Sequence, residues 1–198
     1  LLRSESIESE SSSDEQSKLS KYHEVIMTGR RLNLMTGARS SHPDIMDYML
    51  KRYTELKLRT HHKVELLQEA LSGGNAKVVN LVLQYTKLKF KIEYIPFVIR
   101  GENISILTRF SKQFGDQFRD YIATHQIDLI EDVDNLEVIT FLLDHGLDVE
   151  TVIRSSGCRT NCGIIALAVS KLGRERVLEL VDKPEPYVIA YLDDMYPN

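Results

Sequence analysis

The chain has 198 residues, 42% of them hydrophobic and 27% charged, which is ordinary for a globular protein and excludes a fibrous or wholly disordered one. No apolar run approaches the roughly 20 residues that span a bilayer, so we expect no membrane contact. The two cysteines are too few to staple a small secreted fold, and we therefore expect an intracellular protein of the cytoplasm or nucleus.

Residues 1–20 predict a disordered, acidic, serine-rich tail. They hold eight serines and five acids against Arg3 and Lys18, with few large apolar side chains to offset chain entropy. Serines set among acids suit acidophilic kinases, so the segment is either a phosphorylation-prone tail or merely a solvating one. The tail carries most of the net charge of −4, so residues 21–198 are nearly neutral and we do not expect nucleic acid as a partner.

Residues 21–198 predict one domain of repeated helix pairs. A polar residue followed by an amphipathic helix recurs at His42, Asn75, Asn103, Asn135 and, more weakly, Arg174. The intervals are 33, 28, 32 and 39 residues, close to the period of a two-helix repeat. Such short helices are marginal alone, so their apolar faces should be buried between neighbours. The faces expected in this core include Ile45, Met46, Met49, Leu50, Val78, Val79, Leu81, Val82, Ile106, Leu107, Phe110, Val138, Ile139, Phe141, Leu142, Leu143, Val177, Leu178, Leu180 and Val181.

Both ends of the array also have helical patterns. Residues 24–35 predict the first helix of the first pair, and residues 188–192 predict a closing helix. Gly146 is expected to end the helix that follows Asn135, because glycine readily takes the left-handed conformation of a helix stop.

Two segments resemble the ankyrin repeat. Residues 64–82 match the family's pattern at Leu67, Ala70, Gly74, Asn75, Val78, Val79 and Leu81, and Leu83 matches just after them. Residues 137–150 look like the second helix and outgoing loop of that repeat, with Leu147 in the place where the family usually has alanine. The Thr-Pro-Leu-His start of the family's first helix is missing, so the loops should be less regular. Such divergent arrays are similar to the ankyrin-like proteins of large DNA viruses or intracellular bacteria.

The resemblance implies an all-α fold, an α-solenoid of about four to five divergent ankyrin-like helix-turn-helix repeats. It also implies a non-enzymatic scaffold without cofactor or metal, which holds a protein partner through its concave face and its inter-repeat loops. The identity of that partner does not follow from the sequence. A homodimer is a further expectation, since truncated arrays can cap themselves on a copy. An alternative is another α-helical repeat adaptor of the longer two-helix type.

Residues 87–94 interrupt the helical pattern. Lys87, Lys89 and Lys91 alternate with Leu88, Phe90, Ile92 and Tyr94, which is the period of a strand. This alternation predicts either a short β-hairpin finger or extended loop between two repeats, or an interruption of the array. The apolar side would then face either a partner or the core.

The candidate partner-binding residues lie in three places. They are Lys57, Arg59, His61 and His62 in a basic stretch, the three lysines Lys87, Lys89 and Lys91, and Asp148, Glu150 and Arg154 after Gly146. A cationic patch would meet an acidic partner, and paired imidazoles would add a pH response. The competing interpretation is a set of solvated inter-repeat loops.

Cys158 and Cys162 are the remaining chemical candidates. Two thiols four residues apart can begin a zinc site, but no second pair of ligands lies nearby, and His145 is the closest histidine in sequence. Arg154 and Arg159 could activate a nucleophilic thiol. We expect reduced thiols, and a small Cys-centred metal-binding protein or hydrolase is the alternative.

Overall fold

In a computed structural model of the chain, the described residues are 26–40, 42–53, 57–130, 133, 135–154, 161–181 and 186–196. Within these ranges the regular elements are all helices, with no strand, so the predicted all-α class is confirmed. The tail predicted for residues 1–20 lies outside them.

The helices follow one another with short connections. After a first helix over residues 26–39 come α2 (Pro43–Arg52), α3 (Thr60–Ser72), α4 (Ala76–Thr86), the 3-10 turn η1 (Ile92–Tyr94), α5 (Ile95–Arg100), α6 (Ile104–Phe114), α7 (Asp116–Thr124), α8 (Gln126–Ile130), α9 (Leu136–Leu143), α10 (Val149–Arg154), α11 (Cys162–Leu172), α12 (Arg174–Leu180) and α13 (Pro186–Met195). The predicted first and closing helices are thus both present.

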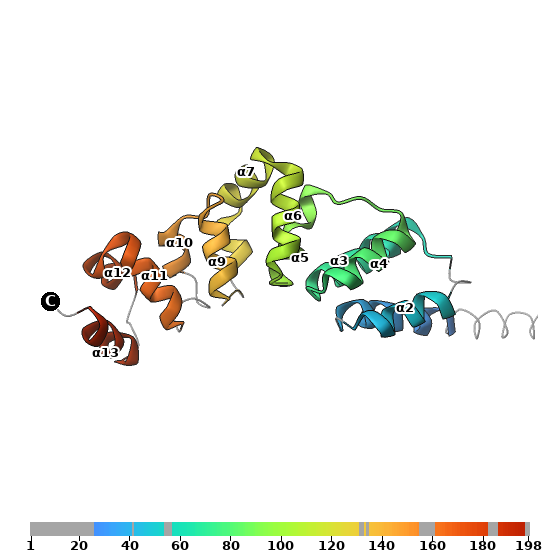
Figure 1. The fold of residues 1–198 in the computed structure, drawn as a ribbon, viewed down its shortest axis with the longest axis horizontal. Helices are drawn as coiled ribbons and strands as arrows, with labels where there is room; N and C mark the ends of the chain where they lie inside the picture. Colours follow the sequence, from blue (N-terminus) through green and yellow to red (C-terminus); the bar gives the residue numbers. More distant parts are fainter. Residues whose placement is uncertain are drawn as a thin grey trace, which may run out of the picture.

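The helices pack in two rows. In one row α3 contacts α5, α5 contacts α8, α8 contacts α10 and α10 contacts α12. In the other, α2 contacts α4, α6 contacts α9 and α9 contacts α11. Members of the two rows alternate along the chain, and Figure 1 shows the labelled helices following one another along the long axis. The helix α7 stands outside this order, packed on α6, α8 and η1.

Asparagine caps begin four helices of the second row. Asn75, Asn103, Asn135 and Asn161 have extended backbones, and each side-chain oxygen accepts from backbone N–H groups of its own first turn. This satisfies donors that would otherwise have no partner at a helix start. The cap of α11 was not predicted: the sequence pattern put the fifth second-row helix at Arg174. That assignment was wrong, because α11 packs on α9 whereas α12 packs on α10.

Two of these caps also join neighbouring units. The amide of Asn103 donates to the carbonyl of Gly74 over 2.7 Å, and the amide of Asn135 donates to Glu102 Oε2 over 3.4 Å. The turns themselves approach closely: a Cβ on Gly101 would lie 2.1 Å from the Leu71 carbonyl oxygen. Gly74 has a φ of +70°, which only glycine adopts without strain.

The core lies between the rows and contains most of the predicted apolar faces. Val79, Leu107, Ile139 and Ile165, four residues after the respective caps, are all 1% exposed or less. Gly146 has a φ of +106° and follows α9, as predicted for a helix stop. Ile45 is the clear exception among the expected core residues, since 46% of it is exposed.

Candidate functional site

Residues 88–91 form a single extended connector between Lys87, the C-cap residue of α4, and η1. Lys87 takes a left-handed conformation, with a φ of 59°, and its N–H closes α4 on the Leu83 carbonyl. The chain then runs to Lys91, whose backbone is extended. The predicted β-hairpin was wrong, because no second strand pairs with this segment among the described residues. The alternation of lysines and apolar residues in the sequence reflects their burial: the three lysines are exposed, whereas Phe90 and Tyr94 are buried.

Phe90 anchors the connector. Its side chain is 7% exposed and its ring lies 4.5 Å from that of Phe110 on α6. The guanidinium of Arg109 lies 4.7 Å from the same ring and also donates to Asn80 Oδ1 on α4 over 2.9 Å. The apolar side of the segment is therefore part of the core. Because Phe90 packs on Phe110, the lysines on the other side of the segment are left exposed.

The backbone of the connector keeps an open edge. Leu88 N–H donates to Thr86 Oγ1 over 3.4 Å, and the Lys91 carbonyl accepts from Tyr94 N–H. Within the described residues, the N–H groups of Lys89 and Lys91 have no hydrogen-bond partner. An extended segment with unpaired backbone groups is a place where another extended chain can add.

The basic stretch before α3 is partly helical. Arg59 is the N-cap residue of α3, and His61 and His62 lie in its first turn rather than in a loop. That turn contains no acidic residue. The positive end of the helix dipole therefore adds to the charges of Lys57 and Arg59, so anions are favoured here.

His62 is held by a neighbouring helix. Its Nε2 lies 2.7 Å from Arg31 Nη1 in the helix over residues 26–39. A guanidinium can only donate, so Nε2 accepts and this imidazole is neutral in the bonded state. Burial, and next the Arg31 charge, lower the pKa of His62 below its usual value of 6.5. His62 is a contact between units and not a free cation.

The two groups of cations lie at one end of the α3–α4 pair. These helices pack on one another and are joined by the tight turn at Gly73 and Gly74, so α4 ends where α3 begins. Figure 1 shows this end at the upper edge, where the long connector leaves α4.

We call the exposed cations here the basic edge: Lys57, Arg59, Lys87, Lys89 and Lys91. In the described part of the chain, none of them forms an ion pair. Among the described residues, Glu65 and Glu93 are the exposed acids nearest to them in sequence.

The third predicted group lies elsewhere and has structural contacts. Asp148 Oδ2 accepts from Thr151 N–H over 3.0 Å, and Glu150 pairs with Arg176 on α12 over 2.8 Å and with Arg154 over 3.6 Å. These residues belong to α10 and its start. The structure does not bring them to the basic edge.

Ser111 and His145 form the one pairing that resembles catalytic geometry in the described residues. Ser111 Oγ lies 2.8 Å from His145 Nε2, and His145 Nδ1 lies 2.7 Å from the Phe141 carbonyl. The carbonyl can only accept, so Nδ1 carries the proton and, in the neutral ring, Ser111 donates to Nε2. Ser111 lies inside α6, however, where backbone N–H groups are used by the helix, so no oxyanion hole accompanies it. The pair links α6 to the end of α9.

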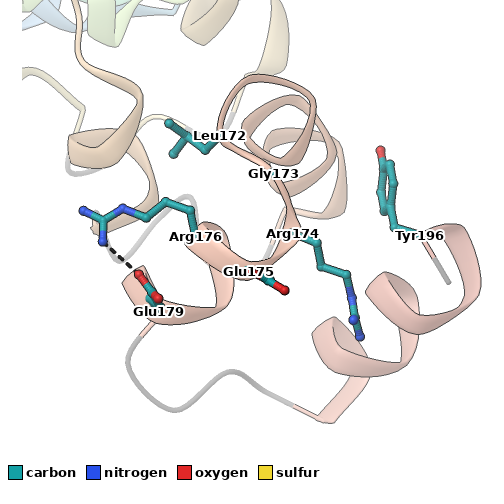
Figure 2. Close-up of a pocket in the computed structure, with 7 residues that line it drawn as sticks. All are labelled: Leu172, Gly173, Arg174, Glu175, Arg176, Glu179 and Tyr196. Carbon is teal, nitrogen blue, oxygen red and sulfur yellow. Dashed lines mark hydrogen bonds and ion pairs between the residues drawn. The ribbon is translucent and has the colours of Figure 1, made fainter. Parts of the chain in front are cut away.

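A surface depression of about 520 Å³ lies between the end of α11, α12 and α13 (Figure 2). Arg176 points toward Glu179, with a separation of 2.9 Å, and Arg174 reaches Asp193 on α13. Both guanidiniums are thus already matched by carboxylates. Neither arginine is therefore available to bind an anionic ligand in the depression.

The chemical alternatives gain no support from the side-chain arrangement. Cys162 is the first residue of α11 and is half-buried as a free thiol, whereas Cys158 lies outside the described residues. In the described ranges, no three His, Cys, Asp or Glu side chains come together in a way that could hold a metal ion. None of the described helices is both long and apolar enough to cross a membrane.

Comparison with known proteins leaves the chain without an assigned family. No protein-family model, no curated protein and no solved structure matches it.

Proposed function

We propose that the chain is an ankyrin-like solenoid whose function is to hold a protein partner, and that it does so with the basic edge rather than by catalysis. The observation that carries this proposal is the fixed row of three exposed lysines on an extended connector. The two-row packing and the recurring asparagine caps support the ankyrin-like reading.

The spacing of the lysines favours an extended acidic segment of the partner. Alternate residues of an extended chain are about 6.7 Å apart, so Lys89 and Lys91 repeat at the pitch of alternate side chains in another extended peptide. Lys87, in its left-handed conformation, adds a third exposed charge at the end of α4. Glutamates or aspartates at every second position would each meet one ammonium group. The open backbone edge beside them would supply hydrogen bonds to the same peptide.

Lysine on such an edge also selects its occupant. Exposed lysines discourage the edge-to-edge pairing of like chains, because their charges repel one another. A negatively charged segment removes this repulsion. The edge therefore favours acidic partners and disfavours pairing with the same edge of another copy.

Charge reversal of the connector tests the proposal. Affinity capture with K87E/K89E/K91E should lose the proteins that wild type retains, whereas K77E/K112E/K171E, which reverses three exposed lysines elsewhere, should keep them. The triple arginine variant should also keep them, since it preserves the charge. Capture that is indifferent to the connector but sensitive to the control would refute this site.

A peptide probe measures the same contact directly. A fluorescent peptide of alternating glutamate and threonine should bind the wild type more weakly as salt rises, because exposed charges are screened. A peptide with the same composition but with all glutamates in one block should bind less well. Equal binding of the two peptides would show that the lysine spacing has no role.

A further inference from the structure

One position in the second-row helices shows where the stack is open. Three residues after each asparagine cap, the side chain is buried: Val78, Ile106, Val138 and Ile164 are 0%, 4%, 0% and 1% exposed. Ile45 lies three residues after the N-cap His42 of α2 and is 46% exposed. The same position in the same kind of helix therefore has two very different environments.

The difference follows from order in the row. Contacts between units show that this side of a second-row helix faces the preceding pair: Arg109, six residues after its cap, reaches back to Asn80 on α4. The described part of the chain places no pair before α2. At the position equivalent to Arg109, Tyr48 is 60% exposed, with the guanidinium of Arg52 6.0 Å from its ring.

These side chains form an apolar stripe on α2. Ile45, Tyr48 and Arg52 follow helical spacing along one side, and we call them the end face. Burying a large aliphatic side chain fully is worth about 1.5–3 kcal/mol, so covering this end favours association.

The charges of α2 identify the occupant. The helix begins with Asp44 and Asp47 and ends with Lys51 and Arg52; Asp47 pairs with Lys51 over 2.6 Å within the helix, and Asp44 and Arg52 are exposed at its two ends. If two copies pair their α2 helices in antiparallel fashion about a two-fold axis, the acids of each helix lie against the bases of the other. The helix dipoles then also oppose one another favourably. A parallel pairing would place like charges together.

We propose that the end face binds a second copy of this chain, with α2 against α2 in antiparallel orientation. This interface is separate from the basic edge and does not depend on the proposed partner. It closes the open end of the row by symmetry, because each end face covers the other.

Molar mass in solution tests the dimer. Light scattering of the full chain, over a concentration range of about a hundredfold, should approach twice 22.7 kDa at the upper end, since association follows mass action. I45E/Y48E should remain monomeric. L136E is the matched control, because Leu136 is 41% exposed on α9 away from the end face; it should dimerise as wild type does.

Mixed charge variants test whether the charges of the two α2 helices face one another across the interface. D44K/D47K makes the helix face wholly basic and K51E/R52E makes it wholly acidic, so each should be monomeric alone. Mixing the two should give a one-to-one dimer, which also shows that both are folded. A wild type that is monomeric throughout, or a dimer untouched by I45E/Y48E, overturns the proposal. Dimerisation of either charge variant alone would show that the charges of α2 do not face one another, and it overturns the pairing of α2 with α2.

Discussion

Asn103 and Gly74 link two neighbouring units by one hydrogen bond, in which the side-chain amide donates to the carbonyl over 2.7 Å. The oxygen of the same side chain caps α6 by accepting from Ile106 N–H over 3.1 Å. One side chain thus starts a helix and fixes its distance from the preceding turn.

Replacing Asn103 separates these two roles. Asn103→Ala should lower the free energy of unfolding by about 2 kcal/mol, with about 1 from the cap and about 1 from the lost bond to Gly74. Asn103→Ser keeps a capping oxygen but cannot donate to Gly74, so it should lose about half as much. Urea unfolding followed by circular dichroism measures both. Equal losses for the two variants would mean that the bond to Gly74 contributes nothing.

Two glycines should respond in opposite directions to alanine. Gly101→Ala should destabilise the fold by about 1–3 kcal/mol, because its Cβ would lie 2.1 Å from the Leu71 carbonyl oxygen. Gly29→Ala should stabilise it by about 0.5–1 kcal/mol, since the position is helical and no atom lies within 4 Å of the new Cβ. Thermal unfolding of both variants checks the signs. A tolerated alanine at Gly101 would contradict the close approach of the turns.

His62 should make stability depend on pH. Its pKa is lowered in the fold, first by burial and next by Arg31, so the unfolded chain binds more protons in this range. The stabilising contribution is therefore complete above the ordinary pKa of 6.5 and is lost as pH falls through the lowered folded value. Melting temperatures between neutral and mildly acid pH should fall less in His62→Gln than in wild type. His42→Gln, at an exposed position, is the control and should follow wild type.

Arg109 should protect the connector from proteolysis. Trypsin cleaves after lysine, and Lys87, Lys89 and Lys91 are held in place by Phe90 beneath the Arg109 guanidinium. Losing this contact costs about 1 kcal/mol, which is about a fivefold rise in the population of the released connector. Arg109→Ala should therefore be cut at these lysines several-fold faster, as mass spectrometry of early fragments would show.

A control variant separates this effect from a general loss of arginine. Arg119→Ala removes an exposed arginine that pairs with Asp116 inside α7, so cleavage of the connector should stay at the wild-type rate. Equal acceleration in both variants would indicate global loosening instead.

Local patterns in the sequence predict much of this fold. The apolar residues after Asn75, Asn103 and Asn135 are buried as their helical period requires, and Gly146 takes the positive φ expected of a helix stop. These features depend on interactions a few residues apart. They can therefore be read without knowing the neighbours.

The errors arise where distant contacts decide the structure. The alternation of residues 87–94 predicts a strand, but Phe90 alternates with the lysines because it packs on Phe110 of α6, and the described residues contain no partner strand. Asn161 was missed because it follows Asn135 by only 26 residues, outside the expected repeat length. Arg31 and Arg109, which hold His62 and Phe90, carry no local signal at all.

The asparagine caps and α7 together indicate how such a chain can change its length. The caps keep the second row in step although they stand 28, 32 and 26 residues apart, so the differences are absorbed by the first row and by the connections on the other edge. The extra helix α7 is one such addition: it packs on α6 of the second row and on α8 of the first, and it buries Phe118 and Ile122 in the core. Insertions and deletions between the caps would therefore alter what the surface presents while the second row stays in step, as long as an added helix buries its own apolar side as α7 does.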